Sequence, residues 1–454
     1  MSSREVARLD GMDVFKRLLW NALVSGVMSS FLWFSVTFWV YLETQSVLAT
    51  SVIGGAFAIF SAVAGMFFGT FVDRHRKHTA MVVASAVALV AYAAAAVQYG
   101  LATDDRILDL SSPRFFVFVG LVLAGSVVGN LRGIALSTTV TLLVPEDRRD
   151  RANGMVGTVM GISFTITSVL SGLVVGQLGM GWAVIIAVSL TATSLVHLLT
   201  IRVEEVQPER GEGAPPLVDL RGAVSTIRAV PGLSGLIMFA AFNNLIAGVF
   251  MSLMDAYGLS LVSVEAWGIL FAVISFGFIL GGMYVARNGL GRRPMRIILA
   301  GNAINWAICS LFALRSSIVM LAIGMLIWMT LIPAIEAAEQ TVLQRAVPFD
   351  HQGRVFGFAQ TVENAASPLT SFLVGPLAQL VAIPFMTDGA GVDLIGGWFG
   401  SGRERGMALI FTIAGLVGLV ATAIASGSRW YRSLSASTAA SGDEDQRVAE
   451  PVGA

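Results

Sequence analysis

VLATSVIGGAFAIFSAVAGMFFGTFVDRHRKHTAMVVASAVALVAYAAAAVQYGL, residues 47–101, is the stretch that decides the fold. Two apolar runs, 47–72 and 79–101, flank a short basic loop. Each run is long enough to cross the roughly 30 Å hydrocarbon core of a bilayer as a helix. Strands of a membrane barrel would be about 9–11 residues long with alternating polarity, and neither run alternates. The stretch therefore predicts two membrane helices joined by a basic turn.

The whole chain shares this composition. Its 454 residues are 55% hydrophobic and 13% charged, with a mean hydropathy of +0.76. Soluble domains carry about 25% charged residues. The net charge of zero gives no indication of a nucleic-acid partner, and Cys309, the single cysteine, rules out an internal disulfide. No nucleotide-binding loop or zinc-protease motif occurs, so we predict no cofactor, no metal centre and no enzymatic activity.

Apolar blocks between charged residues predict twelve membrane helices. Their approximate bounds are 17–42, 47–72, 78–100, 114–144, 152–178, 181–202, 232–258, 264–287, 294–314, 317–346, 354–386 and 405–428.

Lys and Arg residues divide unevenly between the two sides of a membrane that this assignment creates. Of 29 in total, 23 fall on the side of the two termini and 5 on the other, and Arg132 lies inside a predicted helix. Positive residues gather on the cytoplasmic side of membrane proteins. We therefore expect both termini in the cytoplasm.

A polar segment rich in Pro and Gly divides the chain. We predict an N-terminal six-helix bundle at 1–202, a cytoplasmic linker at 203–230, a C-terminal six-helix bundle at 231–430 and a disordered cytoplasmic tail at 431–454. The tail is rich in Ser, Ala and acidic residues, which disfavours a packed core.

The two halves contain an internal repeat at a shift of 203 positions. The shift places Val144-Pro145 on Val347-Pro348, Arg151 on Arg354 and Gly154 on Gly357. Chance alignment of apolar sequence would match Val and Leu rather than Pro, Arg and Gly. A duplicated six-helix unit is typical of one large class of transporters.

The basic loop has a recognisable pattern. Gly69-Thr-Phe-Val-Asp73-Arg74-His75-Arg76-Lys77 resembles the G-x-x-x-D-R-x-G-R-K signature of the major facilitator superfamily. The resemblance implies an all-α membrane protein of twelve helices in two pseudo-symmetric bundles. Residues 348–357 and 367–377 further resemble the macrolide-efflux and siderophore-exporter branch, whose members are proton-driven drug exporters of the bacterial cytoplasmic membrane. The resemblance to this branch implies a monomer whose partners are lipid, protons and a small-molecule substrate.

The resemblance also implies that the loop acid pairs across the interface of the two halves and latches one state of the transport cycle. The predicted latch loop consists of Gly69, Asp73, Arg74, Arg76 and Lys77. The alternative is a solvated basic loop that only fixes topology. Arg76 stands where the signature has glycine, and the antiporter signature of helix five lacks its proline, so the direction of transport rests on the branch resemblance alone.

Charged residues inside predicted helices indicate a functional path. Arg132, Glu336, Glu339 and Glu363 each cost at least about 2.5–3.5 kcal/mol at the centre of a bilayer. Such residues normally face one another or a wet cavity. The predicted proton-coupling and substrate cavity comprises Arg132, Glu336, Glu339, Glu363, Asn364, Gln360, Asn21 and Asn244.

A carboxyl group removed from water favours its neutral form, which makes proton exchange feasible. We expect Glu363 or Glu336 to take a periplasmic proton as the substrate leaves. Arg132 could hold a neighbouring acid ionised or contact an anionic substrate group. The alternative is that Arg132 only bridges Glu336 or Glu363 as a packing ion pair.

These observations predict a proton-driven exporter of hydrophobic or cationic drug-like molecules, and with it antibiotic resistance. One alternative is the export of an endogenous metabolite such as a siderophore. A second is a substrate sensor that keeps the fold without transporting.

Overall fold

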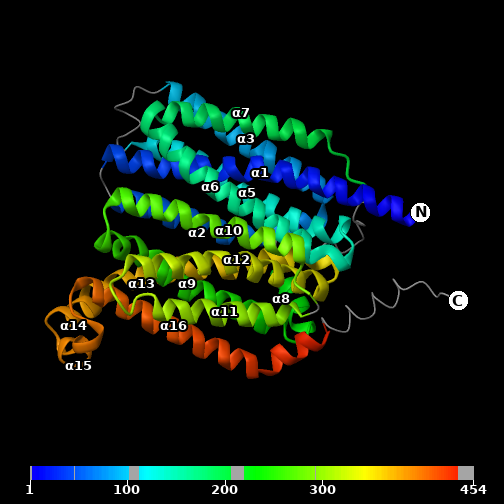
Figure 1. Ribbon diagram of the computed structural model, residues 1–454. Helices are drawn as coiled ribbons and strands as arrows, with labels where there is room; N and C mark the ends of the chain where they lie inside the picture. The colour runs from blue at the N-terminus through cyan, green and yellow to red at the C-terminus, as the bar shows by residue number, and fades with distance from the viewer. Residues whose placement is uncertain (1–2, 45–46, 102–111, 206–218, 292, 438–454) are drawn as a thin grey trace. The chain divides into compact units, whose positions relative to one another are not determined.

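A computed structural model describes residues 3–44, 47–101, 112–205, 219–291 and 293–437. Within these ranges every regular element is helical (Figure 1). Residues 206–218 of the predicted linker and 438–454 of the predicted tail lie outside the described residues.

Each of the twelve predicted membrane segments overlaps a helix, and the predicted segment 354–386 continues beyond α13 through a π-helical turn, Ala378–Ala382, into α14 (Ile383–Thr387). The overlapping helices are α1 (Ser3–Thr44), α2 (Val47–Arg74), α3 (Lys77–Leu101), α5 (Pro113–Leu143), α6 (Arg149–Leu178), α7 (Met180–Thr200), α9 (Leu233–Leu261), α10 (Val264–Asn288), α11 (Pro294–Leu311), α12 (Ile318–Ala346), α13 (Gln352–Leu377) and α16 (Arg403–Gly427).

Among the described residues, nine helices are long and apolar enough to cross a membrane. The number is ten if 373–387 and α15 (Ala390–Phe399), which meet at 75°, form one broken span. The all-α membrane fold is therefore confirmed.

The chain forms two compact units. The first comprises Met1–Ala152, Val159–Thr226 and Val347–Thr361, and the second comprises Asn153–Thr158, Ile227–Ala346 and Val362–Ala454. The units differ from the predicted halves in two short segments. Residues 153–158 near the start of α6 belong to the second unit, and residues 347–361, which include the start of α13, belong to the first.

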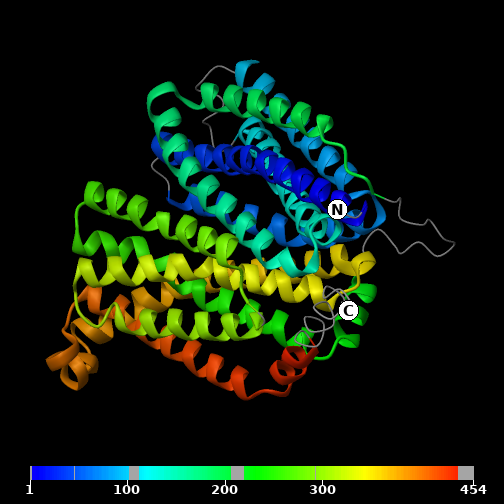
Figure 2. The same cartoon turned by 45° about the vertical axis from the view of Figure 1, so that its right-hand side comes forward.

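Equivalent helices pack in the same pairs within each unit. In the first unit α3 packs against α5 and α7, α1 against α7, and α2 against α5 (Figure 2). In the second unit α11 packs against α12 and α16, α9 against α16, and α10 against α12. These pairings follow the order of the helices in each half, so the duplication predicted from sequence extends to tertiary structure.

The repeat also has the same local structure in both copies. After Val144 and after Val347, a proline with φ −54° begins a single 3-10 turn, Glu146–Arg148 in one copy and Phe349–His351 in the other. The fixed φ of proline suits the start of a helix. The next long helix, α6 or α13, begins directly after each turn.

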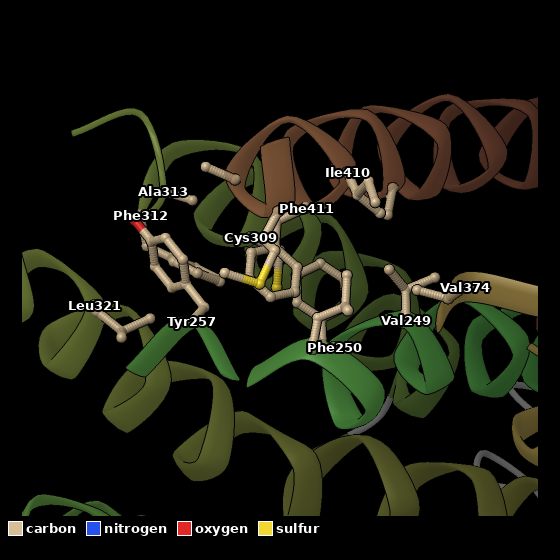
Figure 3. Packing of buried hydrophobic residues seen from close by; sticks show 14 of the residues in the cluster. Val249, Phe250, Tyr257, Cys309, Phe312, Ala313, Leu321, Val374, Ile410 and Phe411 are labelled. Atoms are coloured by element: carbon tan, nitrogen blue, oxygen red, sulfur yellow. The ribbon is translucent and has the colours of Figure 1, made fainter. Parts of the chain in front are cut away.

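An aromatic core fills the second unit (Figure 3). The rings of Phe250 and Phe411 stack at 5.0 Å, and Tyr257 meets Phe411 edge-on at 5.5 Å. Cys309 is buried within this cluster as a packing residue.

Two segments between or beyond the predicted helices are themselves helical. The linker contains α8 (Leu220–Ala229). The prediction of disorder from residue 431 is wrong for 431–437, since residues 429–437 are helical. The reason is packing: Leu434 is fully buried, and the Trp430 ring lies 5.9 Å from the Phe239 ring of α9.

Candidate functional site

Asp73 links the end of α2 to the start of α13 within the first unit. Its carboxylate accepts hydrogen bonds from the main-chain N–H groups of Gly353 and Arg354, at 2.7 and 2.8 Å. It also accepts one from Nε of Arg354 at 2.9 Å. Because α13 begins at Gln352, these two N–H groups belong to its first turn and have no acceptor within the helix. Asp73 therefore caps α13 from 280 residues away in sequence, the separation from Gly353.

A second carboxylate completes this cluster. Arg354 donates from Nη1 to Oδ2 of Asp219 at 2.6 Å. Asp219 precedes α8, accepts a hydrogen bond from the N–H of Gly222 at 2.7 Å, and donates its own N–H to Thr70 at 3.2 Å. Asp219 therefore connects the start of α8 to α2 through Thr70 and to α13 through Arg354.

The cluster is shielded from water. The side chains of Asp73, Asp219 and Arg354 are 2%, 11% and 13% exposed. Burial raises the pKa of Asp73, and the hydrogen bonds and positive charge of Arg354 counter part of that shift. An ionised Asp73 therefore depends on Arg354 for compensation.

Glycines allow α2 and α13 to approach closely. A Cβ added to Gly69 would collide with the carbonyl oxygen of Gly353, and one added to Gly357 would collide with that of Gly65. Glycine is therefore needed at position 69 because a side chain there would collide with the backbone of α13. The backbone conformation at Gly69 does not itself require glycine.

The basic residues of the loop have different environments. Lys77 is 2% exposed, donates from Nζ to the Val72 carbonyl at 3.0 Å and lies 5.1 Å from the Phe349 ring centroid. Its main-chain N–H donates to both oxygens of Glu205 at 2.7 Å, so Glu205 caps α3. Arg76 is exposed, and within the described residues neither Arg74 nor Arg76 is paired with a carboxylate.

Arg132 lies in a buried polar network of the first unit. It is 7% exposed, donates to the side-chain oxygen of Asn21 and donates to Ser85 at 2.7 Å. Its Nε is buried without a partner, and no carboxylate of the described part of this unit is paired with it. Asn21 in turn donates to the Ser194 carbonyl at 2.7 Å and lies 3.0 Å from Nδ1 of His197.

Three carboxyl groups gather in the second unit. The carboxyl groups of Glu339 in α12 and Glu363 in α13 lie next to each other, and Glu336 lies close enough to act electrostatically on both. Oε1 of Glu339 is buried without a hydrogen-bond partner, whereas the Glu336 side chain is exposed. Within the described residues no group of three His, Cys, Asp or Glu side chains has the arrangement of a metal site.

The remaining predicted cavity residues occupy mixed positions. Asn244 is half-buried, Asn364 is exposed, and Gln360 has a buried side-chain oxygen with no partner. Gln360 belongs to the first unit and Asn364 to the second. By contrast, the neighbouring Asn243 accepts a hydrogen bond from the Trp306 indole at 2.6 Å and is a packing residue.

Sequence reasoning missed Asp219, Glu205 and His197. Asp219 had a weak signal, because an acidic residue directly before the run Leu220-Arg-Gly-Ala is a usual helix cap. Glu205 and His197 carry no such pattern, since each contacts residues more than 100 positions away.

Comparison with known proteins identifies the family. The family model of the Major Facilitator Superfamily matches residues 18–371. The chain belongs to the major facilitator superfamily. This membership indicates a membrane transporter rather than an enzyme.

Individual relatives are distant. The enterobactin exporter EntS of Salmonella choleraesuis (strain SC-B67) is 21% identical over 337 residues, 74% of this chain and 77% of the exporter. EntS of Salmonella typhi has the same identity and coverage.

Solved structures of the superfamily have the same fold. A bacterial homologue of the iron transporter ferroportin, in an outward-facing state, has a TM-score of 0.66 at 15% identity over 91% of this chain and 100% of its own. The human organic anion transporter TETRAN has a TM-score of 0.66 at 14% identity over 91% and 99%. The proton:xylose symporter XylE has a TM-score of 0.61 at 14% identity over 91% and 95%.

Proposed function

We propose that this superfamily member exports hydrophobic or cationic drug-like molecules from the cytoplasm in exchange for protons. It works as a monomer of the bacterial cytoplasmic membrane, with both termini in the cytoplasm, by alternating access. Such an exporter would confer antibiotic resistance.

The carboxyl pair of Glu339 and Glu363 is the observation that carries this proposal. Two adjacent carboxyl groups do not both ionise easily, so they hold one proton between them most stably. Among the described residues of the second unit, neither is paired with a cation. A site of this kind suits either a proton or the positive group of a substrate.

The contact between Asp73 and Arg354 supports a latch. The two residues come from opposite halves of the sequence, and a movement that separates α2 from the start of α13 must break three hydrogen bonds to one buried carboxylate. Contacts present in only one state bias a two-state equilibrium. The burial of Asp73 and Lys77 argues against the alternative of a solvated loop.

Export of an endogenous siderophore is the second candidate. It is supported by the similarity to an enterobactin exporter. It is also supported by Arg132, a buried cation that has only neutral partners within the described first unit and therefore suits an anionic substrate group.

Accumulation of fluorescent dyes in cells with and without the protein tests the main proposal. We expect lower dye accumulation in cells that contain the protein, and restoration of accumulation by a protonophore. Glu363→Gln removes the exchangeable proton and should abolish extrusion while leaving the protein in the membrane. Asp393→Asn, at an exposed position of α15, is the matched control and should extrude normally.

Two results would count against the proposal. Full activity of Glu363→Gln would exclude the carboxyl pair as the proton site. No effect on any dye, together with secretion of an iron-binding metabolite that depends on the protein, would favour the siderophore candidate.

A further inference from the structure

The buried amide of Asn21 joins Arg132 to His197. Asn21 is 1% exposed, so its amide has no access to bulk water and must find its partners in the protein. On one side it meets Arg132 of α5, and on the other it meets Ser194 and His197 of α7.

The chemistry of these partners fixes the orientation of the amide. A guanidinium group only donates hydrogen bonds, so the oxygen of Asn21 must face Arg132. The NH₂ group then faces the Ser194 carbonyl, which only accepts, and Nδ1 of His197. Nδ1 must therefore accept as well, and the His197 ring is neutral with its proton on Nε2.

Protonation of His197 is incompatible with this arrangement. A proton from water that binds Nδ1 forms an N–H bond there and turns the imidazole into an imidazolium, which donates from both nitrogens. Asn21 can then satisfy the ring only by turning its amide, so that its oxygen faces His197 and its NH₂ group faces Arg132. Arg132 would lose its acceptor at Asn21 and keep only Ser85, and its Nε has no partner already.

We propose that His197 is a second proton-binding site of the transporter, and that Asn21 makes its protonation and the engagement of Arg132 mutually exclusive. The inference rests on the proposed proton-driven function. His197 is half-buried in the last turn of α7. A proton at His197 releases Arg132 for an anionic group, and by thermodynamic reciprocity an anionic group on Arg132 favours the proton on His197.

Other titratable groups near this end of α7 do not provide the same link. His78 of α3 donates from Nε2 to the carbonyl of Leu198 at 3.1 Å and has no contact with Asn21. No carboxylate is paired with the His197 ring within the described residues. The charged groups on the adjoining segments are Asp13, Lys16 and Arg17 of α1, Lys77 of α3, and Arg202, Glu204 and Glu205 after α7.

Nuclear magnetic resonance of ring-labelled histidine in the purified protein tests the link without measuring transport. The chain has four histidines, and His197→Gln assigns the signal of interest. In Arg132→Gln the amide of Asn21 keeps only the Ser194 carbonyl to fix its orientation, so the pH profile of the His197 signal should change. In an Asn21→Ala background, the same Arg132→Gln substitution should leave the profile nearly unchanged.

One further measurement makes the test decisive. The His78 signal is the internal control and should keep its profile in all variants. An Arg132→Gln shift that persists in Asn21→Ala would show a through-space charge effect and would overturn the proposed link.

Transport separates this inference from the proposed function. In proteoliposomes, His197→Gln keeps an acceptor for Asn21 but cannot bind a proton, so the dependence of export on cytoplasmic pH should become flatter than in the unsubstituted protein. Equal pH dependence in both proteins would overturn the role of His197, whereas the proton-driven export itself would stand. Export that ignores a pH gradient in both proteins would refute the proton-driven function, even if the magnetic resonance link holds.

Discussion

Replacement of Asp73 by Asn should loosen the start of α13 selectively. Asn keeps the size of the side chain but loses the charge, and its NH₂ group would face the donor of Gly353 or those of Arg354, which the carboxylate accepts with separate oxygens. The main-chain N–H groups of these two residues donate hydrogen bonds to Asp73. Their exchange with solvent therefore reports directly on the loss of these bonds.

The structure sets the size of the effect. Loss of one partner from a buried ion pair costs about 3–5 kcal/mol. Here Arg354 keeps Asp219 at 2.6 Å, so part of its charge stays compensated. We expect the contact to lose about 2–3 kcal/mol of stability. This loss corresponds to about a 30- to 150-fold increase in the fraction of molecules in which the start of α13 is separated from Asp73.

Hydrogen–deuterium exchange of residues 347–361, followed by mass spectrometry, measures this population. Exchange in Asp73→Asn should accelerate by that factor, whereas the first turn of α16 should be unchanged. Asp219→Asn is the matched control: it leaves Asp73 on Arg354 and should accelerate exchange by about fivefold or less. Equal acceleration in the two variants, or none in Asp73→Asn, would refute the capping role of Asp73.

Three further substitutions test other parts of the structure. Gly69→Ala should push α2 away from Gly353 and reduce transport severalfold, whereas Gly172→Ala, where no atom lies within 4 Å of an added Cβ, should transport normally. Phe411→Ala should cost about 3–5 kcal/mol of stability because it empties the centre of the second unit's aromatic core, and thermal unfolding in detergent measures the loss. Glu205→Gln should weaken the cap of α3 by about 1 kcal/mol, seen as roughly fivefold faster amide exchange at the start of that helix, and unchanged exchange there would contradict the capping role.

The helices and their duplication could be predicted from the sequence because both depend on local signals. Apolar runs of membrane length are continuous in the chain, and the repeat retains residues with strong backbone preferences. Pro145 and Pro348 are the clearest case, since each begins the same 3-10 turn before a long helix.

The sites depend on contacts that no local pattern encodes. Asp73 was found through a family signature, but its partner Arg354 lies 281 positions later and Asp219 stands in a polar linker. The amide of Asn21 was predicted as a cavity residue, whereas its link to His197 spans 176 positions. Sequence spacing identifies one face of one helix, and only the packed structure shows which faces meet.

The duplication retains close packing in both copies but the carboxylate at this position in only one. In the first unit Gly69 lies against Gly353, and Asp73 adds its carboxylate. In the second unit Gly282 lies equally close to Thr158 of α6, but the position that corresponds to Asp73 is Ala286.

Beside this second contact, neutral side chains join α6 to α12 rather than to α10. Asn153 of α6 donates to Thr341 and to Gln344, both at 2.9 Å. A neutral hydrogen bond contributes about 0.5–1.5 kcal/mol, whereas one to a charged group contributes about 1.5–3. A contact held by a buried carboxylate, such as that of α2 with α13, therefore resists opening more strongly than a contact held by neutral hydrogen bonds of this kind. The glycines of both copies permit the same close approach, so the exchange of Asp73 for Ala286 is what removes the carboxylate from the α10–α6 contact.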